Sequence, residues 1–117
     1  MRDSVETKAR ILKIAEKIFS EVGFDGARVD DIAKKAGVNK ALIYYYFKSK
    51  NEILETILSN LFEEAKNMIV QSARNIPDIS SDDNYRKLFD TYIDFIIKNR
   101  KIIKIAIAES VKDNDRP

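Results

Sequence analysis

Three consecutive tyrosines, Tyr44 to Tyr46, are the residues of this 117-residue chain whose type and spacing best suggest chemistry. Phenol hydroxyls can bond phosphate oxygens, and the rings can contact sugars or the edges of bases. Tyrosines at helical spacing can equally be ordinary core residues. Which interpretation holds depends on the side chains that already fill the inward face of the surrounding helix.

The inward face is set by the 100° step between successive residues of a helix over 40–47. That step places Ile43 and Phe47, four residues apart, on one apolar face. Tyr46 falls nearer the edge of this face, so for Tyr46 a core position and a binding role both stay open.

The outward face of the same helix centres on Ala41 and Tyr45, with Leu42 and Tyr44 beside them. Because the inward face is occupied, we expect Tyr44 and Tyr45 to face solvent and to require a partner. Ala41 is small enough to let the helix backbone approach bases closely, and Ala41 or Leu42 could meet a thymine methyl group. The face therefore suits contact with nucleic acid.

Catalytic and metal chemistry has few candidate residues in this chain. The sequence contains no cysteine and no histidine, which removes the thiol nucleophile, the usual general base and the commonest metal ligands. No nucleophile–base pair, metal cluster or phosphate-binding glycine loop can be assembled from the remaining residues. We therefore expect no enzyme activity, no metal site and no cofactor.

Two short helices joined by a glycine turn position the tyrosine face. Apolar spacing predicts a helix over 29–36, which Gly37 ends because glycine adopts the left-handed backbone at no steric cost. Asn39 then caps the next helix, which is predicted over 40–47. Two short helices joined by so tight a turn are typical of a helix-turn-helix, and an earlier apolar helix that ends at Gly23 supplies the third member of the bundle.

Composition supports an all-α protein with a basic N-terminal half. Residues 1–50 carry 11 Lys and Arg against 7 Asp and Glu, or +4, whereas residues 51–117 carry 10 against 12, or −2. The sequence has no alternating pattern typical of strands, and no apolar run approaches the roughly 20 residues of a membrane span. We expect a cytoplasmic protein that does not contact membranes.

Over about residues 5–55 the sequence resembles the DNA-binding domain of the TetR family of transcriptional repressors. The glycine turn, the Y-x-Y-F ending of the third helix and the S-K-x-E-I-L start of the fourth carry the resemblance jointly. The matching positions are Thr7, Ile11, Leu12, Ala15, Phe19, Gly23, Phe24, Ile32, Ala33, Ala36, Gly37, Val38, Lys40, Tyr44, Tyr46, Phe47, Lys48, Ser49, Lys50, Ile53 and Leu54.

The resemblance implies a role for each matching residue of the reading helix. Phosphate contacts are implied for Tyr44, Tyr46 and Lys50. Contacts toward bases are implied for Lys40, Ala41 and Tyr45. Two positions depart from the family pattern: Arg28 replaces a Ser or Thr that caps the second helix, and Leu42 replaces a frequent threonine. An arginine at this position could hold a phosphate instead of capping the helix. The predicted DNA-binding residues are Arg28, Lys40, Ala41, Leu42, Tyr44, Tyr45, Tyr46 and Lys50.

The remainder of the chain is predicted to be a long fourth helix from Ser49, ending near Asn75–Asp78, and two further helices. Ser80–Asn84 is expected to be a polar connection, Arg100–Lys104 an interruption, and Ile102–Ala108 a largely buried sixth helix. By resemblance these helices begin an effector domain that binds a small molecule. Phe62, Phe89 and Tyr92 are candidate lining residues, although ordinary core is the alternative for all three.

Together these features predict a DNA-binding domain over 1–47, followed over 48–117 by a connecting helix and an incomplete effector-binding and dimerisation domain. The expected function is sequence-specific binding to operator DNA as a repressor that a small-molecule effector releases. The family resemblance implies a homodimer whose interface is not in this sequence. The alternative is a helical protein–protein interaction module that does not bind DNA.

Overall fold

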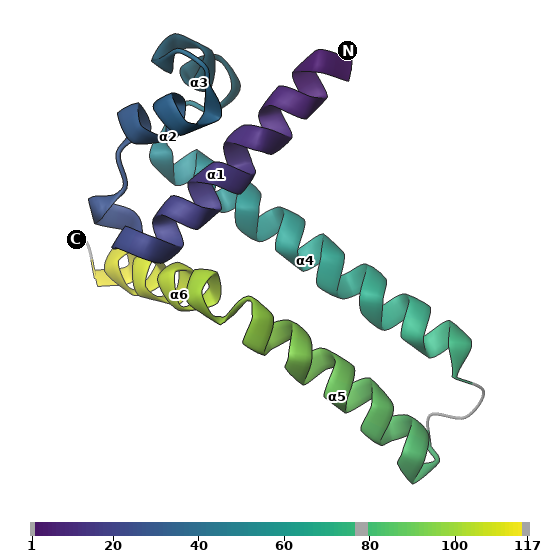
Figure 1. Cartoon of the computed structure of the whole chain (residues 1–117). Helices are drawn as coiled ribbons and strands as arrows, with labels where there is room; N and C mark the ends of the chain where they lie inside the picture. The colour runs from purple at the N-terminus through teal and green to yellow at the C-terminus, as the bar shows by residue number, and fades with distance from the viewer. Residues whose placement is uncertain (1, 77–79, 116–117) are drawn as a thin grey trace.

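The computed structural model describes residues 2–76 and 80–115, with side chains for 4–76 and 80–112. In chain order the helices are α1 (Arg2–Gly26), α2 (Val29–Ala36), α3 (Lys40–Tyr46), α4 (Lys50–Asn75), α5 (Asp82–Lys98) and α6 (Arg100–Asp115). No strand occurs within the described residues, and the predicted all-α class is confirmed. Figure 1 shows α1, α2 and α3 gathered at one end, with α4 and α5 leaving that end as a paired arm.

The core of this end is formed by the apolar faces of α1, α2, α3 and the start of α4. Phe19 and Phe47 are its largest fully buried side chains, and Ile11, Ile32 and Ile43 are fully buried beside them. The remaining core residues are Ala15, Ile18, Phe24, Ala27, Ala33, Ala36, Ile53, Leu54, Ile57 and Ile102. The core therefore includes residues on both sides of the predicted domain boundary at residue 47.

Two glycines with positive φ shape the connections of the helix-turn-helix. Gly23 has φ 81° and ψ 171° and kinks α1 at the position where the sequence predicted its end, although helical structure resumes as far as Gly26. Gly37, with φ 71° and ψ 31°, ends α2 in the left-handed conformation, as predicted. Asn39 Oδ1 then accepts a hydrogen bond of 2.8 Å from the Leu42 N–H, which confirms the predicted cap of α3.

The start of α4 is fixed by two side-chain caps. Ser49 Oγ accepts from the Glu52 N–H at 3.1 Å, and Glu52 Oε2 accepts from the Lys48 N–H at 2.9 Å. Only Ile53, Leu54 and Ile57 of α4 are buried, and all three lie in its first third. The fourth helix thus joins the core at its start, and after Ile57 it contributes only the partly buried Leu58 and Leu61.

The second half of the chain differs from the sequence prediction at the start of α5 and at the break before α6. Helix α5 begins at Asp82, capped by Ser81, so residues 82–84 are helical instead of a polar connection. The interruption predicted at Arg100–Lys104 is wrong, because the chain breaks only at Asn99 and α6 starts at Arg100. The predicted end of α4 at Asn75 is confirmed, but Pro77 and Asp78 lie outside the described residues.

Helix α6 lies across the kinked end of α1 (Figure 1) and is attached there by one fully buried side chain, Ile102. The prediction that Ile102–Ala108 is largely buried is wrong, because Ile107 is 61% exposed and Ala108 is also exposed. Only one stripe of this segment meets α1, so the other side chains stay in contact with solvent.

The arm made by α4 and α5 is poorly covered. No described residue of α5 is fully buried. The radius of gyration is 17.3 Å, whereas a compact domain of this length would have about 13 Å. The structure therefore consists of one well-packed end and one arm whose apolar side chains remain accessible.

Candidate nucleic-acid interface

Helix α3 divides its residues between core and solvent as its spacing predicted. Ile43 and Phe47 are 0% and 1% exposed, whereas Tyr45 is 80% exposed and Tyr44 is 44% exposed. Ala41 is also exposed. The outward face is consequently an accessible helix surface on a rigid support, as groove contact would require.

Tyr46 has the intermediate position that the sequence left open. It is half-buried against the core, and its ring centroid lies 5.3 Å from that of Tyr45 in an edge-to-face arrangement. On its other side the ring is 6.4 Å from that of Phe47. Tyr46 therefore links the exposed Tyr45 ring to the core, and this support limits the orientations that Tyr45 can take.

Beside α3 lies an open, mostly polar hollow of about 500 Å³. Four basic side chains line it: Arg28, Lys40, Lys48 and Lys50. Lys48 was not among the residues predicted from the sequence, although its position in the K-S-K run between α3 and α4 was a signal for it. The hollow also contains the Tyr44 side chain, so residues from three segments converge on one cationic surface.

Arg28 occupies the N-cap position of α2 without capping it. Its side chain accepts no bond from the first turn of the helix, which confirms that the usual Ser or Thr cap is missing. Asp30 and Asp31 stand in that first turn and complement its partial positive charge. The guanidinium is exposed at the edge of the hollow. It could there form a charge-assisted bond with a phosphate.

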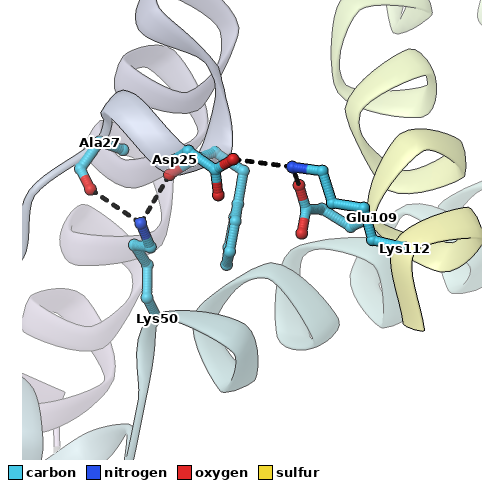
Figure 2. A network of polar contacts seen from close by, with 6 residues as sticks. Asp25, Ala27, Lys50, Glu109 and Lys112 are labelled. Atoms are coloured by element: carbon cyan, nitrogen blue, oxygen red, sulfur yellow. Dashed lines mark hydrogen bonds and ion pairs between the residues drawn. The ribbon is translucent and has the colours of Figure 1, made fainter. Parts of the chain in front are cut away.

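Lys50 is bound to its own protein chain, which the sequence did not indicate. Its Nζ donates to the carbonyl oxygens of Phe24 and Ala27 at 2.7 and 3.1 Å, and it lies 4.4 Å from the centroid of the Phe24 ring. Figure 2 shows the side chain rising from α4 to the turn that joins α1 and α2. These contacts occupy two of the three ammonium donors and fix the ammonium beside the hollow.

The same turn has a second attachment, from α6. Lys112 Nζ donates to Asp25 Oδ2 at 2.7 Å and to Glu109 Oε1 at 3.1 Å, as Figure 2 shows. The hydrogen bonds to Asp25 and Glu109 raise the pKa of Lys112 above its ordinary value. The turn over residues 24–27 is thus held by α4 through backbone carbonyls and by α6 through a carboxylate.

Lys40, at the start of α3, forms an ion pair with an acidic residue of α2. Its Nζ lies 3.1 Å from Asp30 Oδ1, and the two side chains are 52% and 59% exposed. Both residues line the polar hollow. Lys40, for which the resemblance implies a contact toward bases, is therefore partly neutralised in the free protein.

The three candidate effector residues do not converge on one cavity. Phe62 and Tyr92 line an apolar groove of about 600 Å³ between α4, α5 and α6. Phe89 lines a separate hollow of about 200 Å³ between α4 and α5, to which Tyr92 also contributes. Phe62, Phe89 and Tyr92 are 79%, 53% and 42% exposed, so they are not core residues of the described chain.

Two further properties concern the described ranges only. Within them, no three acidic, histidine or cysteine side chains come together as a metal site would need. None of the described helices has the length and apolar character that crossing a bilayer requires.

Residues 11–57 match the sequence profile of the family described as "Bacterial regulatory proteins, tetR family". One relative is the "Probable HTH-type transcriptional regulator YttP" of Bacillus subtilis (strain 168), 31% identical over 110 residues that cover 94% of this chain and 53% of YttP. Another is the "Biofilm operon icaADBC HTH-type negative transcriptional regulator IcaR" of Staphylococcus aureus (strain Newman), 38% identical over 87 residues that cover 74% and 46%. The chain spans about half the length of these curated relatives.

Solved structures agree in fold. A crystal structure described as a "transcriptional regulator (TerR/AcrR family) from Aquifex aeolicus VF5" superposes with a TM-score of 0.71 at 24% identity, over 88% of this chain and 56% of that one. The matched residues 11–57 run from the core of α1 through α2 and α3 into α4. They contain the outward face of α3 and every residue that lines the hollow beside it. By this region the chain belongs to the TetR family of bacterial regulatory proteins.

Proposed function

We propose that this protein binds duplex DNA through α3 and regulates transcription, as a repressor. The observation that carries the proposal is the accessible face of Ala41 and Tyr45 on α3, set directly beside the cationic hollow. A helix of this kind fits the major groove, and the basic residues around it suit the flanking phosphates. The relative IcaR is named a negative transcriptional regulator, and this name supports repression as the proposed activity.

Within this proposal the residues divide into two groups. Residues toward bases lie on the α3 face and comprise Lys40, Ala41, Leu42 and Tyr45. Residues toward phosphates surround that face and comprise Arg28, Tyr44, Tyr46, Lys48 and Lys50. Base contacts determine sequence preference, whereas phosphate contacts add affinity for every sequence and make it depend on salt.

Fluorescence-anisotropy titrations test the assignment of Tyr45. The duplex used is the one enriched from a random pool by the parent protein. Tyr45→Ala should weaken binding to this duplex by roughly ten- to a hundredfold and change the preferred sequence. The matched control is Tyr85→Ala, because Tyr85 is also exposed (61%) but belongs to α5. If Tyr45→Ala and Tyr85→Ala both bind like the parent, α3 is not the reading helix.

Lys50 needs a test that separates its intramolecular contacts from a phosphate contact. Lys50→Met removes both while keeping the apolar stem. Loss of a phosphate contact should reduce the slope of log affinity against log salt concentration by about 0.9 and weaken binding to all duplexes equally. Lys66→Met, on the exposed side of α4, controls for the loss of one positive charge. A salt slope equal to that of Lys66→Met would leave Lys50 with a structural role only.

We also propose that the groove between α4, α5 and α6 receives a small, mainly apolar effector. Its lining is apolar apart from the Tyr92 phenol and the Ser110 hydroxyl, which could orient one or two polar groups of such a molecule. Fluorescence of the anionic dye ANS, whose aromatic rings bind apolar surface, measures access to the groove, with Phe62→Ala as the groove variant. An unchanged dye signal in Phe62→Ala would count against the groove as the site.

The proposal includes a dimer of the chain in the cytoplasm. Repression of an operator normally requires two helix-turn-helix units one helical turn or a multiple apart, which two copies of the chain would supply in the cytoplasm. Sedimentation velocity on the DNA complex measures the stoichiometry. A complex with one copy on a palindromic duplex would contradict the dimer.

A further inference from the structure

The ion pair between Asp30 and Lys40 places a carboxylate among the four basic side chains of the hollow, whose other acidic residue, Asp25, is bound to Lys112 of α6. Asp30 lines the same hollow as Arg28, Lys40, Lys48 and Lys50, and Asp30 Oδ1 is 3.1 Å from the Lys40 ammonium. A surface built only for affinity to phosphates would have no use for a negative charge here, since the charge repels every phosphate that approaches.

The position of Asp30 at the start of α2 does not by itself explain this pairing. A carboxylate in the first turn complements the partial positive charge of the helix, but Asp31 in the same turn supplies that complement too. Asp31 is exposed, does not line the hollow, and forms no ion pair with any described residue. The two acids thus share one helix turn, and only Asp30 contacts Lys40.

The pair changes what Lys40 can bind. A lone ammonium would bind any phosphate oxygen within reach, because a lysine is a flexible point charge with three donors. With one side held by Asp30, the ammonium is partly neutralised and its remaining donors are confined to the start of α3. A guanine, which offers two acceptors in the major groove, can still satisfy those donors.

We propose that Asp30 is a specificity-determining residue that acts through Lys40. It lowers affinity for DNA of arbitrary sequence and positions the ammonium so that Lys40 contributes where base acceptors face it. This inference rests on the proposed DNA-binding function and deepens it. Asp30 itself contacts no base in this scheme, so it is a positioning residue.

The experiment compares Asp30→Asn with Asp31→Asn. Both variants remove one carboxylate from the first turn of α2 and change the net charge equally, so they share any effect on helix stability and overall charge. Affinity is measured by anisotropy on a random-sequence duplex over a range of salt concentrations. Base preference is measured by selection from a random duplex pool with each purified variant.

Asp30→Asn should bind the random-sequence duplex about three- to tenfold more tightly than Asp31→Asn does. The slope of its log affinity against log salt concentration should be steeper by about 0.9, the value for one phosphate contact. The sequences that it selects should be less sharply defined. In a Lys40→Gln background, Asp30→Asn and Asp31→Asn should select equally well defined sequences, because the ammonium that Asp30 positions is no longer present.

Two results would overturn the inference, and they are distinguishable. If the parent binds DNA but Asp30→Asn and Asp31→Asn give the same affinity, slope and base preference, Asp30 has no special role while the proposed function stands. If the parent shows no salt-dependent binding to any duplex, the proposed function fails and the role of Asp30 fails with it. Circular dichroism melts confirm that both variants are folded.

Discussion

Replacing Ile102 with alanine tests whether α6 is an integral part of the end that contains the helix-turn-helix. Ile102 is 2% exposed and belongs to the same core cluster as Phe19 and Ile11 of α1, although it lies more than 80 residues later in the sequence. It is also the single fully buried residue in the described part of α6. The attachment of α6 to α1 therefore depends heavily on this one side chain.

The expected cost follows from the burial. Truncation of a fully buried isoleucine to alanine removes its transfer free energy and leaves a cavity, which together cost about 2–5 kcal/mol. For a chain of this size, each kcal/mol corresponds to roughly 4 °C in Tm, so Ile102→Ala should lower Tm by about 8–20 °C. Ile107→Ala removes the same atoms from a residue that is 61% exposed and should cost within about 0.5 kcal/mol.

Thermal and urea unfolding followed by circular dichroism measure both variants, and hydrogen exchange locates the loss. If α6 is integral, the whole bundle loses stability and the urea m-value is unchanged. If α6 is only loosely docked, exchange of its amides accelerates while the amides of α1 keep their protection. A Tm for Ile102→Ala within about 2 °C of that for Ile107→Ala would refute the reasoning from burial.

Two further predictions concern a turn and an ion pair. Gly37→Ala should destabilise the protein by about 1 kcal/mol, measured by urea unfolding. The cause is the positive φ of 71° at Gly37, because nothing lies within 4 Å of a Cβ added there. Gly26→Ala, at a glycine without positive φ, should cost less. Lys112→Gln should lower Tm slightly at neutral pH. The raised pKa of Lys112 means that its ion pair with Asp25 is complete below the unfolded value near 10.5. The difference in Tm should therefore disappear as the pH rises through the folded pKa, and a difference that persists there would exclude the charge as its cause.

The helix-turn-helix could be predicted from sequence because each of its signals is local. Gly37 and Asn39 determine the conformation and cap of their own turn, and the four-residue spacing of Ile43 and Phe47 determines which face of α3 is buried. The burial of Tyr46 could not be resolved in this way. Its position at the edge of the core depends on how α3 packs as a whole.

The wrong predictions for the second half of the chain were based on the composition of short segments, which does not determine their structure. Arg100–Lys104 contains three basic residues, but Lys and Arg are good helix formers, and the chain breaks at Asn99 instead. The apolar residues in Ile102–Ala108 suggested a buried helix, although only one stripe of it finds a partner. An apolar pattern predicts which residues can be buried, and the neighbouring helix decides which are.

The polar contacts of the candidate site could not be predicted from the sequence. Their partners are distant along the chain, or are backbone carbonyls that every residue type carries. Lys50 binds carbonyl oxygens 26 and 23 residues away, and any residue type at those two positions would offer the same acceptor. The pairing of Lys40 with Asp30 requires α2 and α3 to be placed first. The resemblance that assigned Lys50 to phosphate gave no indication of the two bonds that already hold it.

The two attachments of the turn over residues 24–27 differ in how strongly they resist change. The contact from α4 uses backbone carbonyls, so no substitution at Phe24 or Ala27 removes the acceptors of Lys50, and its partly buried position limits screening by salt. The contact from α6 depends on the exposed carboxylate of Asp25, which is 77% accessible and open to counterions. Because Arg28 and α2 follow this turn directly, their position is fixed firmly to α4 and only weakly to α6. Movement of α4 would therefore carry the turn with it, whereas α6 could separate from Asp25 at little cost and leave the bond between α4 and the turn intact.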